Sequence, residues 1–167
     1  MIDSNEFTSY IETRFQYICG VPCSYYKDFL AYLDSHIANT QIKHIYATRE
    51  DEAIGIASGV SFIGHKAIVY MQNSGLGNIG DALTSLAQLY KLPMLMLISY
   101  RGLEEDKDFP EHSLMGEVNE PVLKAFKIPY WILNEEKWES ILDKAISVME
   151  ETSSPVALLV KKGVLSN

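Results

Sequence analysis

The sequence predicts an α/β fold, a single three-layer domain whose sheet is mostly parallel. Segments with the period of a strand alternate with segments with the period of a helix about five or six times, without a break in composition. Two strand segments, residues 67–72 and 94–100, are almost entirely apolar, as strands are when helices cover both faces of a parallel sheet. A chain of 167 residues that is 47% hydrophobic can bury a full core, so we expect one domain over residues 1–167.

The elements follow one another in order along the chain. Asp3 and Glu6 resemble a capping box before the first helix, and Ser24 is expected to cap the second. The third helix carries small residues at helical spacing and must lie close to its neighbours. We expect helices at residues 4–14, 25–37, 50–63, 79–90 and 137–151. We expect strands at residues 15–21, 42–47, 67–72, 94–100, 129–133 and 155–162.

Residues 102–120 form one long polar insertion, which we expect to be a functional or mobile loop. The pattern of elements does not predict the order of the strands in the sheet.

Composition excludes several classes of function. The net charge is -8 and no cluster of Lys or Arg is present, so nucleic acid is not an expected partner. The first 20 residues lack the apolar core of a signal peptide, and no uncharged run approaches the ~20 residues of a membrane helix. We therefore expect no membrane association and a cytoplasmic location. Cys19 and Cys23 are spaced one residue too far apart for a C-x-x-C pair and are expected to be buried or loop thiols.

Polar residues gather where the predicted strands end, which is where open α/β sheets bind ligands. An apolar strand runs directly into the loop at residues 72–78, and a helix follows; Gly75 and Gly77 allow the main chain to approach a ligand closely. The polar candidates at these strand ends are Ser24, Glu50, Gln72, Asn73, Ser74, Arg101 and His112. We expect no metal-ligand set in this chain.

Simpler interpretations of the same residues stay open at this point. Gly75, Gly77 and Gly80 spell G-x-G-x-x-G, but two strand candidates precede this turn and no acidic residue ends the next strand, which disfavours a dinucleotide site. The loop is also compatible with a tight turn that binds nothing. Glu50 could serve only as a capping charge at a helix start, and His112 could be a solvated surface histidine.

Five fragments in order resemble the pyrimidine-binding domain of thiamine diphosphate enzymes, most closely the phosphonopyruvate decarboxylase and sulfopyruvate decarboxylase α-subunit family. They are GVPCS at 20–24, REDEAIGIASG at 49–59, MQNSGLGN at 71–78, YRG at 100–102 and DKDFPEHSLMG at 106–116. The resemblance extends from about Phe15 to Gly163. It implies the pyrimidine-binding fold, thiamine diphosphate as cofactor and a 2-oxo acid as substrate.

The resemblance also implies roles for particular residues. The spacing from Glu50 to Gly59 matches the family pattern, so Glu50 is expected to hydrogen-bond N1′ of the aminopyrimidine ring and favour its imino tautomer. The loop residues Gln72, Asn73, Ser74 and Gly75 are expected to line the cofactor.

His112 is expected to transfer a proton or hold the substrate anion, and Asn73 to contact the substrate as well. Ser24 stands where pyruvate decarboxylases carry an aspartate, and a hydroxyl there suits a substrate with a phosphonate or sulfonate group, with Arg101 or Lys107 as the opposing charge.

No G-D-G or Asn-Asn occurs in the sequence, although the family binds Mg²⁺ and the diphosphate through these segments. We therefore expect half an active site, completed by a diphosphate-binding β-subunit that carries both motifs and holds Mg²⁺, in a homo- or hetero-oligomer. The run from Met1 to a final strand favours a natural subunit over an excised domain.

We expect decarboxylation of 3-phosphonopyruvate or 3-sulfopyruvate. The D-x-P-x-H segment favours the first and the division into subunits favours the second. The alternatives are a split carboligase, an oxidative 2-oxo acid enzyme subunit, and a non-catalytic regulatory or assembly subunit.

Overall fold

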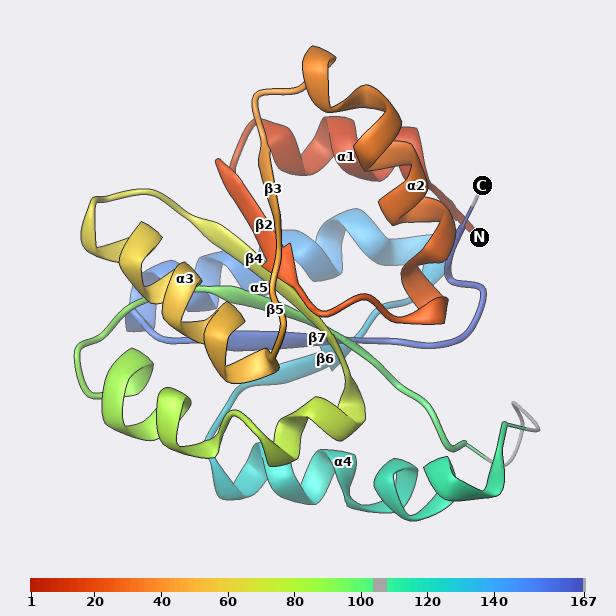
Figure 1. Cartoon of the computed structure of the whole chain (residues 1–167), viewed down its shortest axis with the longest axis vertical. Coiled ribbons are helices and arrows are strands. Elements are labelled where there is room, and N and C mark those ends of the chain that lie inside the picture. Colours follow the sequence, from red (N-terminus) through yellow and green to blue (C-terminus); the bar gives the residue numbers. More distant parts are fainter. Residues whose placement is uncertain (104–107, 167) are drawn as a thin grey trace.

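The computed structural model describes residues 1–103 and 108–166 and has three layers, with one sheet between two layers of helices (Figure 1). The six strands of this sheet are all parallel and follow the order β3-β2-β4-β5-β7-β6. They are β2 (Tyr17–Gly20), β3 (Lys43–Tyr46), β4 (Ala67–Gln72), β5 (Leu95–Ser99), β6 (Tyr130–Ile132) and β7 (Val156–Val160). The predicted α/β class and parallel sheet are confirmed.

The α-helices are α1 (Ser4–Glu12), α2 (Lys27–His36), α3 (Glu50–Phe62), α4 (Ser113–Ala125) and α5 (Trp138–Thr152). A π-helix, η4 (Ala82–Gln88), occupies most of the segment predicted as an ordinary helix at residues 79–90. Short 3₁₀ turns connect several elements: η1 (Ser24–Tyr26), η2 (Ile37–Asn39), η3 (Asn73–Gly77), η6 (Pro110–His112) and η7 (Glu135–Lys137).

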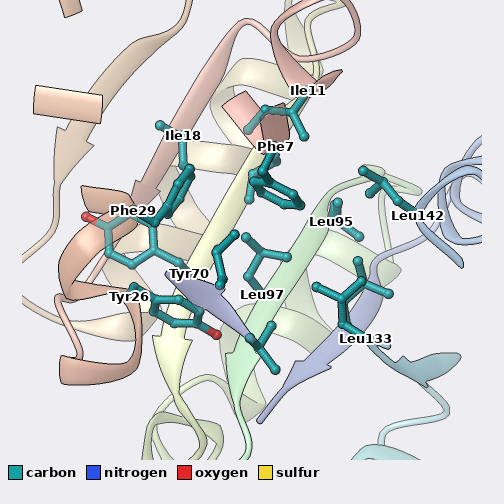
Figure 2. Packing of buried hydrophobic residues seen from close by; sticks show 14 of the residues in the cluster. Phe7, Ile11, Ile18, Tyr26, Phe29, Tyr70, Leu95, Leu97, Leu133 and Leu142 are labelled. Atoms are coloured by element: carbon teal, nitrogen blue, oxygen red, sulfur yellow. The ribbon is translucent and has the colours of Figure 1, made fainter. Parts of the chain in front are cut away.

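Alternating side chains of each strand pack into two separate cores, because successive residues of a strand point to opposite faces. In β4, Ile68 and Tyr70 join one core, while Val69 and Met71 join the other. The first core contains side chains of α1, α2 and α5, including Phe7 and Phe29, whose rings meet edge to face at 5.5 Å (Figure 2). The second contains side chains of α3, η4 and α4. This division explains why the central strands are apolar throughout.

A second, two-stranded sheet was not predicted. Strand β1 (Ile2–Asp3) pairs in parallel with β8 (Leu165–Ser166), which brings the two ends of the chain together (Figure 1). Strands of two residues are too short to show a periodic pattern.

Two further predictions are wrong. Ser24 does not cap a helix: Cys23 takes the N-cap position of η1 without a side-chain hydrogen bond, and α2 begins only at Lys27. Part of the insertion at residues 102–120 is helical, since α4 begins at Ser113. Gly116 and Pro121 weaken the helical signal of α4, but its buried residues Gly116, Asn119 and Leu123 do follow helical spacing.

The capping role of Asp3 is confirmed, because its side chain accepts hydrogen bonds from the amides of Asn5 and Glu6.

Candidate active site

The strand order brings the predicted site residues to one edge of the sheet. Strands β2, β4 and β5 are neighbours, with β3 beside β2, so their carboxyl ends lie together. Gln72 is the last residue of β4, and the segments that follow β2, β3 and β5 carry Ser24, Glu50 and Arg101. The sequence could place each residue at a strand end, and the strand order makes those ends adjacent.

Glu50 is the first residue of α3, where a carboxylate is stabilised by the amides at the helix start. Its side chain is half-buried and lies against the loop that follows β4. The side-chain amide of Asn78 donates a hydrogen bond to Glu50 Oε2 at 2.8 Å. One carboxylate oxygen is therefore held by the loop.

Gly75 is required by this packing. A Cβ atom on Gly75 would lie 2.5 Å from Cγ and 3.0 Å from Oε1 of Glu50, closer than non-bonded atoms approach. The glycine makes room for the glutamate side chain, whereas the sequence reasoning expected it to admit a ligand. A Cβ at Gly77, two residues further on, would meet no atom of the described residues within 4 Å.

Arg101 connects the segment after β2, the end of β4 and the segment after β5. Its guanidinium donates two hydrogen bonds to Asp108, from Nε at 2.9 Å and from Nη2 at 2.7 Å. Its Nη1 donates to Gln72 Oε1 at 3.2 Å and to Ser24 Oγ at 3.4 Å. The guanidinium also stacks on the ring of Tyr25, 5.0 Å from the ring centre.

The Arg101–Asp108 pair is largely shielded, with side-chain exposures of 12% and 8%. The hydrogen bonds from Arg101 hold the pKa of the Asp108 carboxyl well below its usual range, and the carboxylate in turn raises the pKa of Arg101. Both groups are therefore charged at neutral pH.

His112 joins this group through Asp108. Its Nδ1 lies 3.2 Å from Asp108 Oδ1 but is not aligned for a hydrogen bond, and its side chain is 15% exposed. Ser24, Gln72, Arg101, Asp108 and His112 are called the Arg101 cluster below.

Two other loop residues have supporting contacts. Asn73 is fully buried, and its amide donates to the carbonyl oxygen of Arg101 at 2.9 Å. Its Oδ1 is buried without a hydrogen-bond partner in the described part of the chain. Ser74 is exposed and accepts a hydrogen bond from Gln72 at 2.9 Å. Asn73 thus fixes the backbone of Arg101, and Ser74 holds the Gln72 amide.

The segment that carries Asp108 and His112 is held by close backbone contact. Gly102 has φ +84°, and a Cβ there would lie 1.9 Å from the carbonyl oxygen of His112. A Cβ on Gly116 would lie 2.4 Å from the carbonyl oxygen of Gly102. These two glycines let the chain after β5 lie directly against the start of α4.

Sequence reasoning missed Asp108, Tyr25 and Asn78. Asp108 stands four residues before His112 within a fragment that carried the family resemblance, so its position was the available signal. The contacts of Tyr25 and Asn78 depend on the fold and had no signal in the sequence. Lys107, the other expected cation, lies outside the described residues.

A pocket of about 560 Å³ opens beside the Arg101 cluster. Its lining comes from the segments after β2, β5 and β7, which leave the sheet on the same side (Figure 1). The lining residues are Ser24, Tyr25, Asp28, Arg101, Asp108, Phe109, Pro110, Lys162, Gly163 and Leu165.

Both cysteines are buried free thiols, as predicted. Burial raises the pKa of Cys19 to about 12, so this thiol is protonated at neutral pH. None of the helices in residues 1–103 and 108–166 combines the length and apolar character that a bilayer crossing requires.

The model of the family described as "Thiamine pyrophosphate enzyme, N-terminal TPP binding domain" matches residues 10–122. The sulfopyruvate decarboxylase subunit alpha of Methanocaldococcus jannaschii is 36% identical, with 89% of this chain and 86% of the relative covered. The subunit of the same name from Methanococcus maripaludis is 34% identical, with 92% and 90% covered. The phosphonopyruvate decarboxylase of Streptomyces viridochromogenes is 26% identical over 90% of this chain but only 38% of its own length.

Solved structures share the fold. A putative thiamin diphosphate-dependent enzyme from Mycobacterium smegmatis superposes with a TM-score of 0.71 at 17% identity, covering 96% of this chain and 31% of that one. A 2-oxoglutarate:ferredoxin oxidoreductase from Magnetococcus marinus gives a TM-score of 0.69 at 16% identity, covering 96% and 28%.

Proposed function

The chain belongs to the sulfopyruvate decarboxylase α-subunit family of thiamine pyrophosphate enzymes, and from this premise we propose that it is the pyrimidine-side subunit of a thiamine diphosphate-dependent decarboxylase. Its substrate is 3-sulfopyruvate, and the products are sulfoacetaldehyde and CO₂. The relatives named sulfopyruvate decarboxylase subunit alpha match this chain at 34–36% identity over nearly their whole length, whereas those named phosphonopyruvate decarboxylase match at 26–28% identity over less than half of theirs. A sulfopyruvate decarboxylase of Methanosarcina acetivorans also matches over only 38% of its length, so coverage reflects the division into subunits and not the substrate. The higher identity to the sulfopyruvate subunits supports the sulfonate over the phosphonate.

The observation that carries the proposal is the placement of Glu50. Its side chain lies at the start of α3 and packs against Gly75, where a Cβ atom would collide with it. The side chain is half-buried, so part of it stays accessible from outside the chain. These features fit a group that must present a carboxylate to a ring nitrogen of a cofactor that arrives from outside this chain. Glu50 would hold N1′ of the aminopyrimidine by a hydrogen bond and share a proton with it.

When bound, thiamine diphosphate supplies the electron sink that accepts the electron pair left as the C1–C2 bond of the 2-oxo acid breaks. The residues of this chain position the reactants. Gln72, Ser74 and the backbone at Gly75 would line the pyrimidine ring, and Asn73 would hold the loop from inside.

The Arg101 cluster would bind the substrate. The Nη1 edge of Arg101 and the hydroxyl of Ser24 both offer hydrogen bonds to an acid group in the pocket. His112 would either move a proton at C2 of the substrate or hold its anionic group, as expected from the sequence.

The complete active site requires a second subunit. No G-D-G or Asn-Asn segment is present in this chain, so we propose that a β-subunit with both motifs holds Mg²⁺ and the diphosphate. Its docking over the half-buried Glu50 would exclude water from the cofactor site. Two equivalent sites require at least two chains of each kind. The free, buried thiols suit the cytoplasmic location that we propose.

Reconstitution with such a subunit tests the proposal. The purified chain, its partner, thiamine diphosphate and Mg²⁺ are incubated with 3-sulfopyruvate, and CO₂ and sulfoacetaldehyde are measured. We expect turnover only when both subunits are present. Carboligation without aldehyde release, or turnover by the partner alone, would instead support the carboligase or the non-catalytic alternative.

A further inference from the structure

Lys162 lines the same pocket as Arg101 and Ser24. It follows β7, which pairs directly with β5, the strand that precedes Arg101. In the register of these two strands Ser99 pairs with Val160, and Arg101 and Lys162 each stand two residues beyond this last pair. The sheet therefore brings two cationic side chains to the same pocket from neighbouring strand ends.

A turn fixes the backbone of Lys162. The amide of Val164 donates a hydrogen bond to the carbonyl oxygen of Lys161 at 3.3 Å, and Gly163 between them has φ +74°, which a glycine adopts without strain. The amide of Ile2 donates to the carbonyl oxygen of Val164 at 2.7 Å, so the turn is also tied to the strand at the start of the chain. Lys162 is thus presented by a fixed turn at the pocket.

The same turn separates two neighbouring lysines. Lys161 is half-buried and lines a different hollow, beside Leu133 and Glu135. Lys162 is exposed and lines the pocket of Arg101, so its ammonium is accessible to a ligand there.

The charges on the described lining of the pocket make Lys162 necessary for an anion. The lining carries two cations, Arg101 and Lys162, and two carboxylates, Asp28 and Asp108. Asp108 already accepts two hydrogen bonds from Arg101, at 2.9 and 2.7 Å, so this pair offers an entering anion little net charge. Without Lys162 the described lining would carry one net negative charge, which would repel an acid group.

We propose that Lys162 binds the acid group on C3 of the substrate and is a specificity-determining residue of this site. Nη1 of Arg101 and the Ser24 hydroxyl would give directed hydrogen bonds, and Lys162 would supply positive charge from the segment after β7. Pyruvate has no acid group on C3 and would gain nothing from this lysine. The inference rests on the proposed decarboxylase function and names a residue that selects an acid-substituted 2-oxo acid.

Two substitutions of Lys162 test this role in the complex with the partner subunit, thiamine diphosphate and Mg²⁺. Lys162→Gln removes the charge and should raise KM for 3-sulfopyruvate about tenfold or more, the scale of a lost hydrogen bond to a charged group. We expect kcat to stay near the wild-type value, because the acid group on C3 keeps its charge from the bound substrate to the transition state. Lys162→Arg keeps the charge and should retain most of the wild-type affinity.

A binding measurement gives a result that does not depend on turnover. The compound 3-sulfopropanoate keeps the acid tail of the substrate and lacks the keto group. Calorimetric titration of the complex should give a Kd for 3-sulfopropanoate that rises in Lys162→Gln by about the same factor as KM.

Lys161→Gln is the matched control, since it removes the same charge from the adjacent residue, which lines the other hollow. It should leave KM and the Kd of 3-sulfopropanoate unchanged. Lys107→Gln is a comparison variant, because Lys107 is the other cation expected near the substrate and lies outside the described residues. A rise in KM for Lys107→Gln with none for Lys162→Gln would assign the acid group to Lys107 and overturn the inference.

The outcomes separate this inference from the function on which it rests. If the complex decarboxylates 3-sulfopyruvate and Lys162→Gln changes neither KM nor the Kd of 3-sulfopropanoate, the inference is wrong and the proposed function stands. An equal effect of Lys161→Gln would show a response to overall charge and would also contradict it. If the wild-type complex releases no CO₂ from 3-sulfopyruvate, the proposed function fails, whereas the binding of 3-sulfopropanoate still tests Lys162.

Discussion

At the scale of single residues, Glu50 and Gly75 form one unit. Asn78 donates a hydrogen bond to one carboxylate oxygen of Glu50, and the Glu50 side chain packs against the backbone of Gly75. The orientation of Glu50 therefore depends on the absence of a side chain at position 75. The sequence predicted that both residues matter. It could not predict their contact, because that contact depends on how the segments after β3 and β4 are placed by the sheet.

Glu50→Gln should lower decarboxylation by roughly 10²-fold or more, because the amide keeps the shape of the carboxylate but cannot share a proton with N1′. Thermal unfolding and partner binding should be unchanged. Glu52→Gln is the control, since Glu52 is exposed on the same helix and its carboxylate accepts hydrogen bonds from the neighbouring Thr48. A comparable loss of activity in both variants would contradict the assignment of Glu50 as the residue that shares a proton with N1′.

Gly75→Ala should lower activity more than it lowers stability, because the new Cβ would displace the side chain of Glu50. Gly77→Ala adds the same methyl group two residues away, where it would meet no described atom within 4 Å, and should be nearly neutral. Activity and melting temperature are measured on the same samples. Equal effects of the two substitutions would show that the loop, rather than Glu50, responds to the change.

Asp108 should stabilise the fold in a pH-dependent manner. Its pKa in the folded protein is lowered, mainly by the hydrogen bonds from Arg101, so its contribution is present above the ordinary pKa of about 4 and is lost as the pH falls through the folded value. The difference in unfolding free energy between the wild type and Asp108→Asn should be larger at pH 7 than at pH 3. Denaturant titrations at both pH values measure it, and a difference that grows toward pH 3 would contradict the assigned charge.

At the scale of elements, α4 is the clearest departure from the sequence prediction. Its first part lies in the polar stretch at residues 102–120, which was predicted as a loop, and Gly116 and Pro121 are both accommodated in the helix that forms. Gly116 is needed because the backbone of Gly102 crosses the helix there, and Pro121 is exposed on the outer side. Local propensity was overridden by a tertiary contact that no pattern in the sequence reveals.

Gly116→Ala should destabilise the protein by about 1–3 kcal/mol, because the added Cβ would collide with backbone atoms of Arg101 and Gly102 that cannot rotate away. It should also reduce activity, since the same contact places the segment that carries Asp108 and His112. Gly55→Ala is a matched control in α3, where a Cβ would meet no described atom within 4 Å; it should be neutral or stabilise by up to about 1 kcal/mol. Chemical denaturation gives both values, and a smaller loss for Gly116→Ala than for Gly55→Ala would be inconsistent with this packing.

At the scale of the whole molecule, the α/β class and the six-stranded parallel sheet could be predicted, because strand and helix periods alternate along the chain and the central strands are apolar on both faces. The order of the strands could not be predicted, because it is decided by how helices pack across the sheet and not by any local period. That order is what gathers Ser24, Gln72 and Arg101 into hydrogen-bond contact.

The central claim is that this chain supplies only the pyrimidine side of the site. Calorimetric titration with thiamine diphosphate and Mg²⁺, performed on the purified chain alone and on its complex with a G-D-G subunit, tests it most directly. We predict weak or undetectable binding by the chain alone and tight, Mg²⁺-dependent binding by the complex. Tight, Mg²⁺-dependent binding by the isolated chain would contradict the account.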